Sequence, residues 1–419
     1  MKTALLTFLG GRRNKPRDNN TIYESTAYQF PDGSLETTDY FAAALRHKHH
    51  FSQIVILGTA TSIWDKLADD AGDLELALEI IPQTDEVQGH GLMIESLKKL
   101  EILLTASWGT EVILFAGEGG ITSENAQQEM MRYVEILQKI QADEILLDFT
   151  HGFRSMPMLL NSALQFWQSL QTIHTPIRMV YGEFSQHGDS TVHYLDDIQH
   201  SMKVAQAVRL FFEKMDGSEL AGLVEGFWPS GCRYLKELTE RLQENKLNQI
   251  GSPLRQFSNS LQKMSHLEQA PPWFKPIRIR LIQWLEIIQN ETLPLTLANL
   301  AEQFSKNRLH TQAIIALHEA MVEQFLLARN QSSRNLSDRE RKDIIEEAKW
   351  ELGEEFRNSF DDLQKLRNFV AHGAREVRSQ KNYHYSLSEY FKKHFNALYP
   401  VMLQPKRYFS IEPKPQHND

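Results

Sequence analysis

The segment 366–373, with the sequence LRNFVAHG, carries three polar side chains that can contact phosphate. Arg367 provides a planar cation, Asn368 an amide, and His372 a ring that titrates near neutral pH. Asn368 and His372 are four residues apart and are therefore neighbours on one side of a helix. Arg367 lies further round, but its long side chain can reach a phosphate that the imidazole also contacts. We therefore expect a cation, an amide and a titratable ring to share one ligand.

A helix must position these side chains. Leu363, Leu366, Phe369 and Val370 recur at helical spacing and are expected to bury one face, which leaves the three polar side chains on another surface. Polar residues on the open face of an amphipathic helix are most often only solvated. The pattern alone therefore does not establish a catalytic site.

A second polar run, THGFR at 150–154, joins an apolar strand-like segment to a helix. A strand-to-helix turn of this kind directs free backbone N–H groups at whatever occupies the loop. Gly152 allows a close backbone approach. The side chains that could bind a phosphate or stack on a base are Thr150, His151, Phe153 and Arg154. An ordinary turn with a packed Phe153 is an equally simple interpretation.

The first half alternates short apolar runs with longer amphipathic ones, which is typical of strands joined by helical crossovers in a mostly parallel sheet. Strands are predicted at Thr3–Leu9, Gln53–Leu57, Glu111–Phe115, Glu144–Phe149 and Ile177–Tyr181. Helices are predicted at Thr38–His47, Leu92–Ala106, Ser123–Ile140 and Pro157–Gln171, with Thr122 or Ser123 as the N-cap of the third. We therefore expect a Rossmann-like α/β domain over residues 1–195.

Ligands of such sheets bind beyond the carboxyl ends of the strands, so two further loops bear on the site. Gly10, Gly11 and Arg12 follow the first predicted strand, and the segment 58–62, which includes Thr59, follows the second. Neither loop completes a G-x-G-x-x-G or a Walker pattern, which disfavours an NAD site or a P-loop ATPase. Glycine, hydroxyl and arginine at one edge still fit a phosphate-bearing ligand.

Beyond about residue 196 the strand signal fades and helical periodicity takes over. Residues 196–294 are expected to form an all-α connector, with helices at Ser201–Met215, Gly231–Gln243, Pro253–Lys263 and Ile277–Gln289. Residues 295–419 are expected to form a compact all-α unit, with helices at Leu295–Phe304, Leu309–Arg329, Asp338–Lys349, Glu354–His372 and Ser386–Leu398. The charged run DRERK at 338–342 is interpreted as a solvated helix start.

The composition sets the class of protein. A length of 419 residues favours two or three domains, each large enough to fold by burial of its own core. Cys232 is the only cysteine, which fits a reducing compartment, and no segment resembles a signal peptide or a membrane span. We therefore expect a cytoplasmic protein with no membrane partner. The net charge of −9 is concentrated before residue 300, so a polyanion site is expected to be local and in the near-neutral C-terminal third.

These features together resemble the CARF-HEPN ribonucleases of type III CRISPR systems. The resemblance rests on DFTHGFRSMP at 148–157 in a Rossmann-like half, a helical connector, and then RNFVAH at 367–372. It implies a homodimer or higher oligomer whose CARF domains, residues 1–195, jointly bind a cyclic oligoadenylate, with four adenylates favoured over six. By position, Thr150, His151, Gly152, Phe153 and Arg154 match the ligand loop, whereas Gly10, Arg12 and Thr59 follow from loop position only.

The resemblance also implies that two HEPN domains, residues 295–419 of each copy, form a composite site that cuts single-stranded RNA without a metal or cofactor. Arg367 and His372 match the HEPN motif, and Asn368 matches the polar residue between them. The expected products carry a 2',3'-cyclic phosphate and a 5'-hydroxyl, and the acid or base role of His372 stays open. The alternative is a nucleotide-sensing adaptor whose HEPN domain binds RNA or a protein without cutting.

Overall fold

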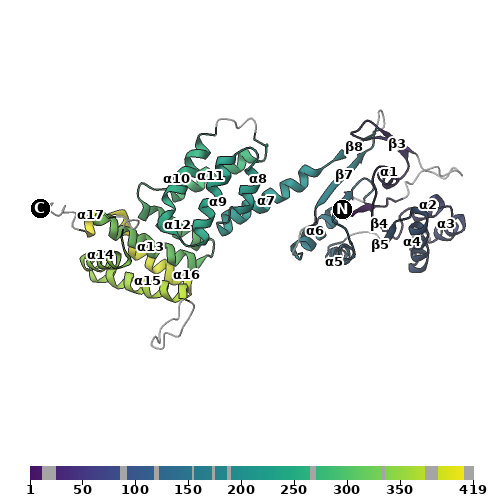
Figure 1. Ribbon diagram of the computed structural model, residues 1–419. Helices are drawn as coiled ribbons and strands as arrows, with labels where there is room; N and C mark the ends of the chain where they lie inside the picture. The colour runs from purple at the N-terminus through teal and green to yellow at the C-terminus, as the bar shows by residue number, and fades with distance from the viewer. Residues whose placement is uncertain are drawn as a thin grey trace. The chain divides into compact units, whose positions relative to one another are not determined.

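The structure, a computed structural model, describes residues 1–11, 25–84, 92–117, 122–152, 155–171, 175–185, 190–264, 270–331, 336–372 and 386–409. The chain divides into two compact units, Met1–His200 and Ser201–Asp419 (Figure 1). Strands and helices mix in the first unit, whereas the described residues of the second contain helices and no strand.

The N-terminal unit is built on an eight-stranded sheet with the order β3-β2-β8-β7-β6-β1-β4-β5. The strands are β1 Thr3–Phe8, β2 Thr26–Gln29, β3 Leu35–Thr38, β4 Gln53–Thr59, β5 Glu111–Gly117, β6 Glu144–Asp148, β7 Ile177–Glu183 and β8 Ser190–Tyr194. From β7 across to β5, neighbouring strands run parallel. Every residue of β4 is buried, as expected for a strand whose sheet is covered on both faces.

Side chains alternate between two hydrophobic cores, one on each face of the sheet. In β1, Leu5 belongs to one core and Leu6 to the other, and Ile54 and Val55 divide in the same way in β4. The first core is closed by the helices α1 Phe41–Lys48, α2 Trp64–Asp70, α3 Leu74–Ile80 and α4 Ile94–Trp108, and the second by α5 Ala126–Leu137 and α6 Ser155–Ser169. The predicted Rossmann-like α/β arrangement is therefore confirmed.

The C-terminal unit consists of packed helices around one continuous hydrophobic core, which runs from Val204 to Phe409. Its helices are α7 Asp196–Lys214, α8 Ser218–Val224, α9 Pro229–Gln243, α10 Gly251–Gln262, α11 Phe274–Ile288, α12 Leu293–Lys306, α13 His310–Ala328, α14 Asp338–Glu351, α15 Glu354–His372, α16 Leu387–Leu403 and α17 Pro405–Tyr408. A short 3-10 turn, Leu247–Gln249, precedes α10. The predicted division into a connector and a HEPN domain stays a prediction.

All five predicted strands are present, but the sequence reasoning missed the three short strands β2, β3 and β8 at one edge of the sheet. Thr38 ends β3 and does not begin a helix. The predicted N-cap of α5 is also wrong. Asn125 occupies that position, and the Thr122 N–H donates to the Asn125 Oδ1 at 2.7 Å, so the two residues close a turn before the helix.

Candidate functional site

Three loops meet at the carboxyl edge of the parallel strands β6, β1 and β4. Gly11 after β1 forms a β-bridge with Ser62 after β4, and the Ile63 N–H donates to the Gly10 carbonyl at 3.1 Å. A Cβ added at Gly10 would lie 3.4 Å from the carbonyl oxygen of His151, which follows β6. Because β1 is the sheet neighbour of both β6 and β4, the topology brings these loops together.

We expected Gly152 to let the backbone approach a ligand closely. In the structure it lets the backbone approach side chains of the protein itself. A Cβ at this position would lie 2.8 Å from the Cγ of Pro157 and 3.1 Å from the ring of Phe8. Both distances are shorter than ordinary van der Waals contact, so a larger residue would have to displace the loop after β6 or the end of β1. Gly152 therefore fixes the path of the loop.

Thr59 lies in a cluster of hydroxyl groups in the loop after β4. Its N–H donates to the Ser62 Oγ at 2.9 Å, and its carbonyl accepts the indole N–H of Trp64 at 2.8 Å. Its hydroxyl is 3.3 Å from that of Thr61. Thr59 is buried and Thr61 is only half-buried, so Thr59 shapes the loop while Thr61 is the more accessible hydroxyl.

A buried carboxylate holds Thr150 in place. Asp148, at the end of β6, accepts hydrogen bonds from the Thr150 N–H at 2.8 Å, the Thr150 hydroxyl at 2.6 Å and the Thr7 hydroxyl at 2.6 Å. Burial raises the pKa of Asp148, and the hydrogen bonds from Thr150 and Thr7 oppose that effect. The Thr150 hydroxyl also accepts the Gly182 N–H at 2.9 Å. The sequence reasoning missed Asp148, although an acidic residue that ends an apolar strand is a usable signal.

The His151 ring is engaged by helix α1. Its Nε2 accepts a hydrogen bond from the backbone N–H of Phe41, the first residue of that helix, at 3.1 Å. A ring nitrogen that accepts a hydrogen bond carries no proton, so this contact requires the neutral ring. In this arrangement His151 brings no charge toward a phosphate. Arg12, Phe153 and Arg154 lie outside the described residues, and their role in ligand binding stays a prediction.

Helix α15 buries one face, and three of the four residues that the sequence spacing predicts for that face lie on it. Leu363 and Leu366 are buried, and Val370 packs against the same core. Phe369 is 41% exposed, so its assignment to the buried face is wrong. At 3.6 residues per turn it points roughly 120° away from Leu363. Phe360, three residues before Leu363, completes the buried face and packs edge-on against Phe325.

Arg367 lies at the margin of that buried face and not on a separate surface with Asn368. It follows Leu363 by four residues, roughly 40° further round the helix. Its side chain is 34% exposed, and its Nη2 is 4.0 Å from the Glu319 Oε1 of α13. Its Nη1 donates to the Asn368 Oδ1 at 3.1 Å. His372 ends α15, and its side chain is not among those described.

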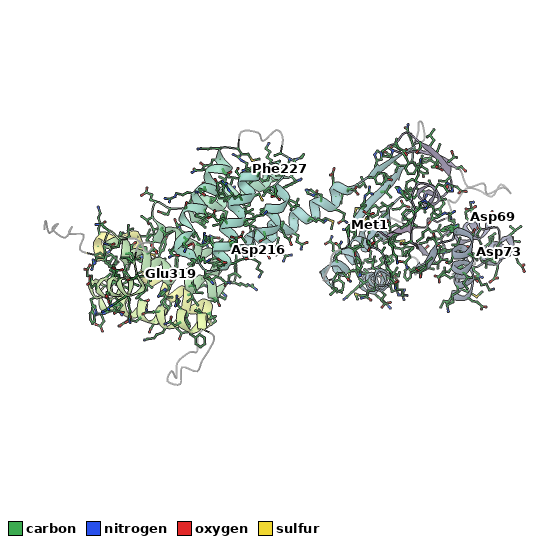
Figure 2. The ribbon with its side chains drawn as sticks, in the orientation of Figure 1. Met1, Asp69, Asp73, Asp216, Phe227 and Glu319 are labelled. Atoms are coloured by element: carbon green, nitrogen blue, oxygen red, sulfur yellow. The ribbon has the colours of Figure 1, made fainter. Side chains whose placement is uncertain are left out.

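The carboxylate of Glu319, on α13, interacts with side chains of α14 and α15. Figure 2 labels Glu319 within the helical unit. Its Oε2 accepts a hydrogen bond from the Arg341 Nη2 of α14 at 2.7 Å, and its Oε1 lies 3.4 Å from the His318 Nδ1. Burial would raise the pKa of Glu319, but the hydrogen bonds and charges of His318 and Arg341 outweigh it and lower that pKa to about 2. The carboxylate is therefore ionised, and the interpretation of Arg341 as a solvated residue is wrong.

Clustered metal ligands would mark a different kind of site. In the described ranges, no three or more His, Cys, Asp and Glu side chains gather to hold a metal ion. The histidine-rich end of α1 is engaged otherwise, because His47 pairs with Glu36 at 3.2 Å and His49 contacts the Tyr194 hydroxyl at 2.9 Å. Among the helices that the structure describes, none has both the length and the apolar character needed to cross a membrane.

Comparison with known proteins places the N-terminal unit in a family. Residues 5–182 match the model of the CARF domain of the CRISPR system endoribonuclease Csx1. The CRISPR-associated protein MJ1674 of Methanocaldococcus jannaschii is 25% identical over 171 residues, which cover 36% of this chain and 26% of that protein. The matched part is thus about a quarter of the length of that curated relative.

A solved structure is also similar along the chain. It is Enterococcus italicus Csm6 bound to cyclic hexa-2'-fluoro-hexa-dAMP, with 13% identity and a TM-score of 0.37 over 97% of this chain and 95% of that one. The match to residues 5–182 is independent of this likeness. It includes residues of β1 through β7 and the three loops at the carboxyl edge, but not β8. The family match therefore identifies a CARF domain over residues 5–182 and does not extend to the helical unit.

Proposed function

We propose that this protein is a metal-independent endoribonuclease that a cyclic oligoadenylate activates during type III CRISPR defence. The proposed binding of cyclic oligoadenylate is supported by the convergence of the loops after β1, β4 and β6 in a CARF domain. Gly10 brings two of these loops into direct contact, and the hydroxyl of Thr61 and the backbone of the 150–152 turn lie at the same edge. Such an edge suits a ligand rich in phosphates.

The proposed activator is a ring of identical nucleotides. A ring with rotational symmetry can sit on the two-fold axis of an isologous dimer and present equivalent phosphates to both copies of the loop at 150–154. The proposed receptor is therefore a homodimer. A panel of cyclic tri-, tetra-, penta- and hexa-adenylates, titrated by calorimetry, measures both the preferred ring size and the stoichiometry. One ring per two chains supports the proposal, whereas one ring per chain contradicts the shared site.

The proposed RNA cleavage depends on side chains of α15. In the proposed reaction a ribose 2'-hydroxyl loses its proton and attacks the adjacent phosphorus, which leaves a 2',3'-cyclic phosphate and a 5'-hydroxyl. Arg367 would stabilise the negative charge on the phosphoryl oxygens, and His372 would transfer a proton. The Asn368 side chain holds one amino group of Arg367 at 3.1 Å and so would orient the guanidinium.

The decisive experiment measures cleavage of a labelled single-stranded RNA in EDTA, with and without each cyclic oligoadenylate. We expect activator-dependent cleavage by the parent protein and its loss in the Arg367→Ala, His372→Ala double variant. Lys365→Ala is the matched control, because it removes an exposed cation from the same helix. Full activity in the double variant would refute the catalytic assignment.

A second candidate function is a nucleotide-sensing adaptor that binds RNA or a protein without cutting. The observation that favours it is the placement of Arg367, whose Nε is buried and has no hydrogen-bond partner in the described part of the chain. An arginine drawn toward Glu319 could serve the fold instead of a reaction. Tight binding of a cyclic oligoadenylate with no cleavage of any RNA, at any ring size, would favour this candidate over the nuclease.

A further inference from the structure

Two guanidinium groups from different helices gather at one carboxylate. Arg341 of α14 donates to the Glu319 Oε2 at 2.7 Å, and the Arg367 Nη2 of α15 lies 4.0 Å from the Oε1 of the same group. The distances and the width of a carboxylate place these two nitrogen atoms less than about 9 Å apart. The sequence separates the two arginines by a helix and a turn, so only the fold brings them together.

Both guanidinium groups have N–H donors without a partner among the described residues. A guanidinium can donate five hydrogen bonds, and Arg341 donates one in the described structure. Its Nε is buried without a hydrogen-bond partner in the described residues, and the same is true of the Arg367 Nε. The side chains are nevertheless 27% and 34% exposed, so solvent reaches part of each.

The Glu319 carboxylate has the properties of a group that positions cations. It is only 12% exposed, so it cannot itself bind an RNA that arrives from solvent. It fixes Arg341 by a short charge-assisted hydrogen bond, and it attracts Arg367 at a distance too long for a hydrogen bond. Arg367 is therefore oriented without being fully engaged, which leaves it able to bind an anion.

We infer that Arg341 binds the RNA phosphate backbone beside Arg367, and that Glu319 is the positioning residue for both guanidinium groups. This inference rests on the proposed ribonuclease function and adds a phosphate-binding residue from α14 to the site on α15. Paired arginines suit this task because a guanidinium presents two parallel donors to phosphate oxygens. The substrate feature that they would read is the backbone charge and not the base.

A purely structural role for Arg341 makes different predictions. If Arg341 only forms an ion pair between α13 and α14, its loss would affect the melting temperature but not the salt dependence of RNA binding. As a phosphate ligand it would change both the affinity and the number of counterions that RNA releases on binding. The salt dependence therefore separates the two roles even where a variant is less stable.

The test compares Arg341→Ala and Arg341→Lys with Arg339→Ala, which removes an exposed cation two residues earlier on α14. For activator-dependent cleavage we expect Arg341→Ala to lower kcat/KM roughly 10- to 100-fold, as for loss of a charged hydrogen bond. The loss should come mainly from KM. Arg341→Lys keeps the charge without the planar fork and should recover part of that loss, whereas Arg339→Ala should stay within about twofold of the parent.

Binding to a non-cleavable RNA, with 2'-O-methyl nucleotides throughout, provides the independent readout. The slope of log affinity against log salt should fall by about one in Arg341→Ala and stay at the parental value in Arg341→Lys. An unchanged slope in Arg341→Ala would overturn the inference. If the parent protein binds but does not cut RNA, the proposed cleavage fails while this binding measurement still decides the role of Arg341.

Discussion

Glu319→Gln should destabilise the helical unit because it removes the carboxylate charge that Arg341 contacts while keeping the shape of the side chain. The magnitude follows from the pKa of Glu319, which is lowered from 4.5 to about 2. At 1.36 kcal/mol per pKa unit, this shift corresponds to about 3 kcal/mol of stability at neutral pH. The group is nearly buried, so little of this value is lost to solvent screening.

The pH dependence has a definite sign. A carboxyl group whose pKa is lower in the folded state stabilises the fold above its unfolded pKa, and the stability is lost as the pH falls toward the folded pKa. For Glu319 the loss runs from about pH 5 toward about pH 2. By pH 4 about a quarter of the contribution should be gone, and by pH 3.5 about two fifths. The penalty of Glu319→Gln should shrink by the same fractions.

The assay is urea unfolding followed by far-ultraviolet circular dichroism, at several values between pH 7 and pH 3.5, for the parent and the variant. Taking the difference between the two proteins at each pH removes the titration of all other carboxyl groups. Glu347→Gln serves as the control, because that side chain is exposed on α14 and should change the free energy of unfolding by less than about 0.5 kcal/mol. A penalty for Glu319→Gln that is equally small, or that stays constant with pH, would refute the reasoning.

Three further predictions concern single side chains. Thr150→Val removes the hydroxyl that donates to Asp148 at 2.6 Å, and should weaken binding of the cyclic ligand by roughly tenfold in calorimetry, since a charged hydrogen bond is lost. Gly152→Ala places a methyl group 2.8 Å from Pro157 and should lower stability by roughly 1–3 kcal/mol, measured by thermal unfolding. Burial lowers the pKa of His394, so its neutral ring favours the fold above about pH 6.5 and that stability is lost in acid. His394→Phe should therefore flatten the fall in melting temperature between pH 7 and pH 5.

Strand and helix patterns in the sequence were sufficient to predict the central sheet, because its strands are apolar runs buried on both faces. The predicted strand Gln53–Leu57 shows this best, since it lies within the wholly buried strand β4, which extends to Thr59. The strands β2 and β3 could not be found in this way. They are four residues long, carry mostly exposed and half-buried positions, and pair with neighbouring strands, β2 with both β3 and β8.

The candidate sites were predictable to different degrees. Loop position after parallel strands correctly indicated that the loops containing Gly10 and His151 meet, because sheet topology alone decides this. The contact between His151 and the start of α1 was not predictable, since it joins residues 110 apart in the chain. The gathering of Arg341 and Arg367 at Glu319 depends in the same way on the packing of α13, α14 and α15, which no local spacing specifies.

The placement of Arg367 also bears on how many copies a catalytic site would need. Arg367 and His372 are five residues apart, so on a regular helix their side chains leave the axis roughly 140° apart. Arg367 is directed toward Glu319 at the margin of the core-facing side. The five-residue spacing alone predicts a different direction for His372, whose side chain lies outside the described part of the structure. One phosphodiester could then be reached by Arg367 of one copy and His372 of another more readily than by both from the same helix. This geometry supports a composite site, and it predicts that an Arg367→Ala chain mixed with a His372→Ala chain regains activity that neither variant has alone.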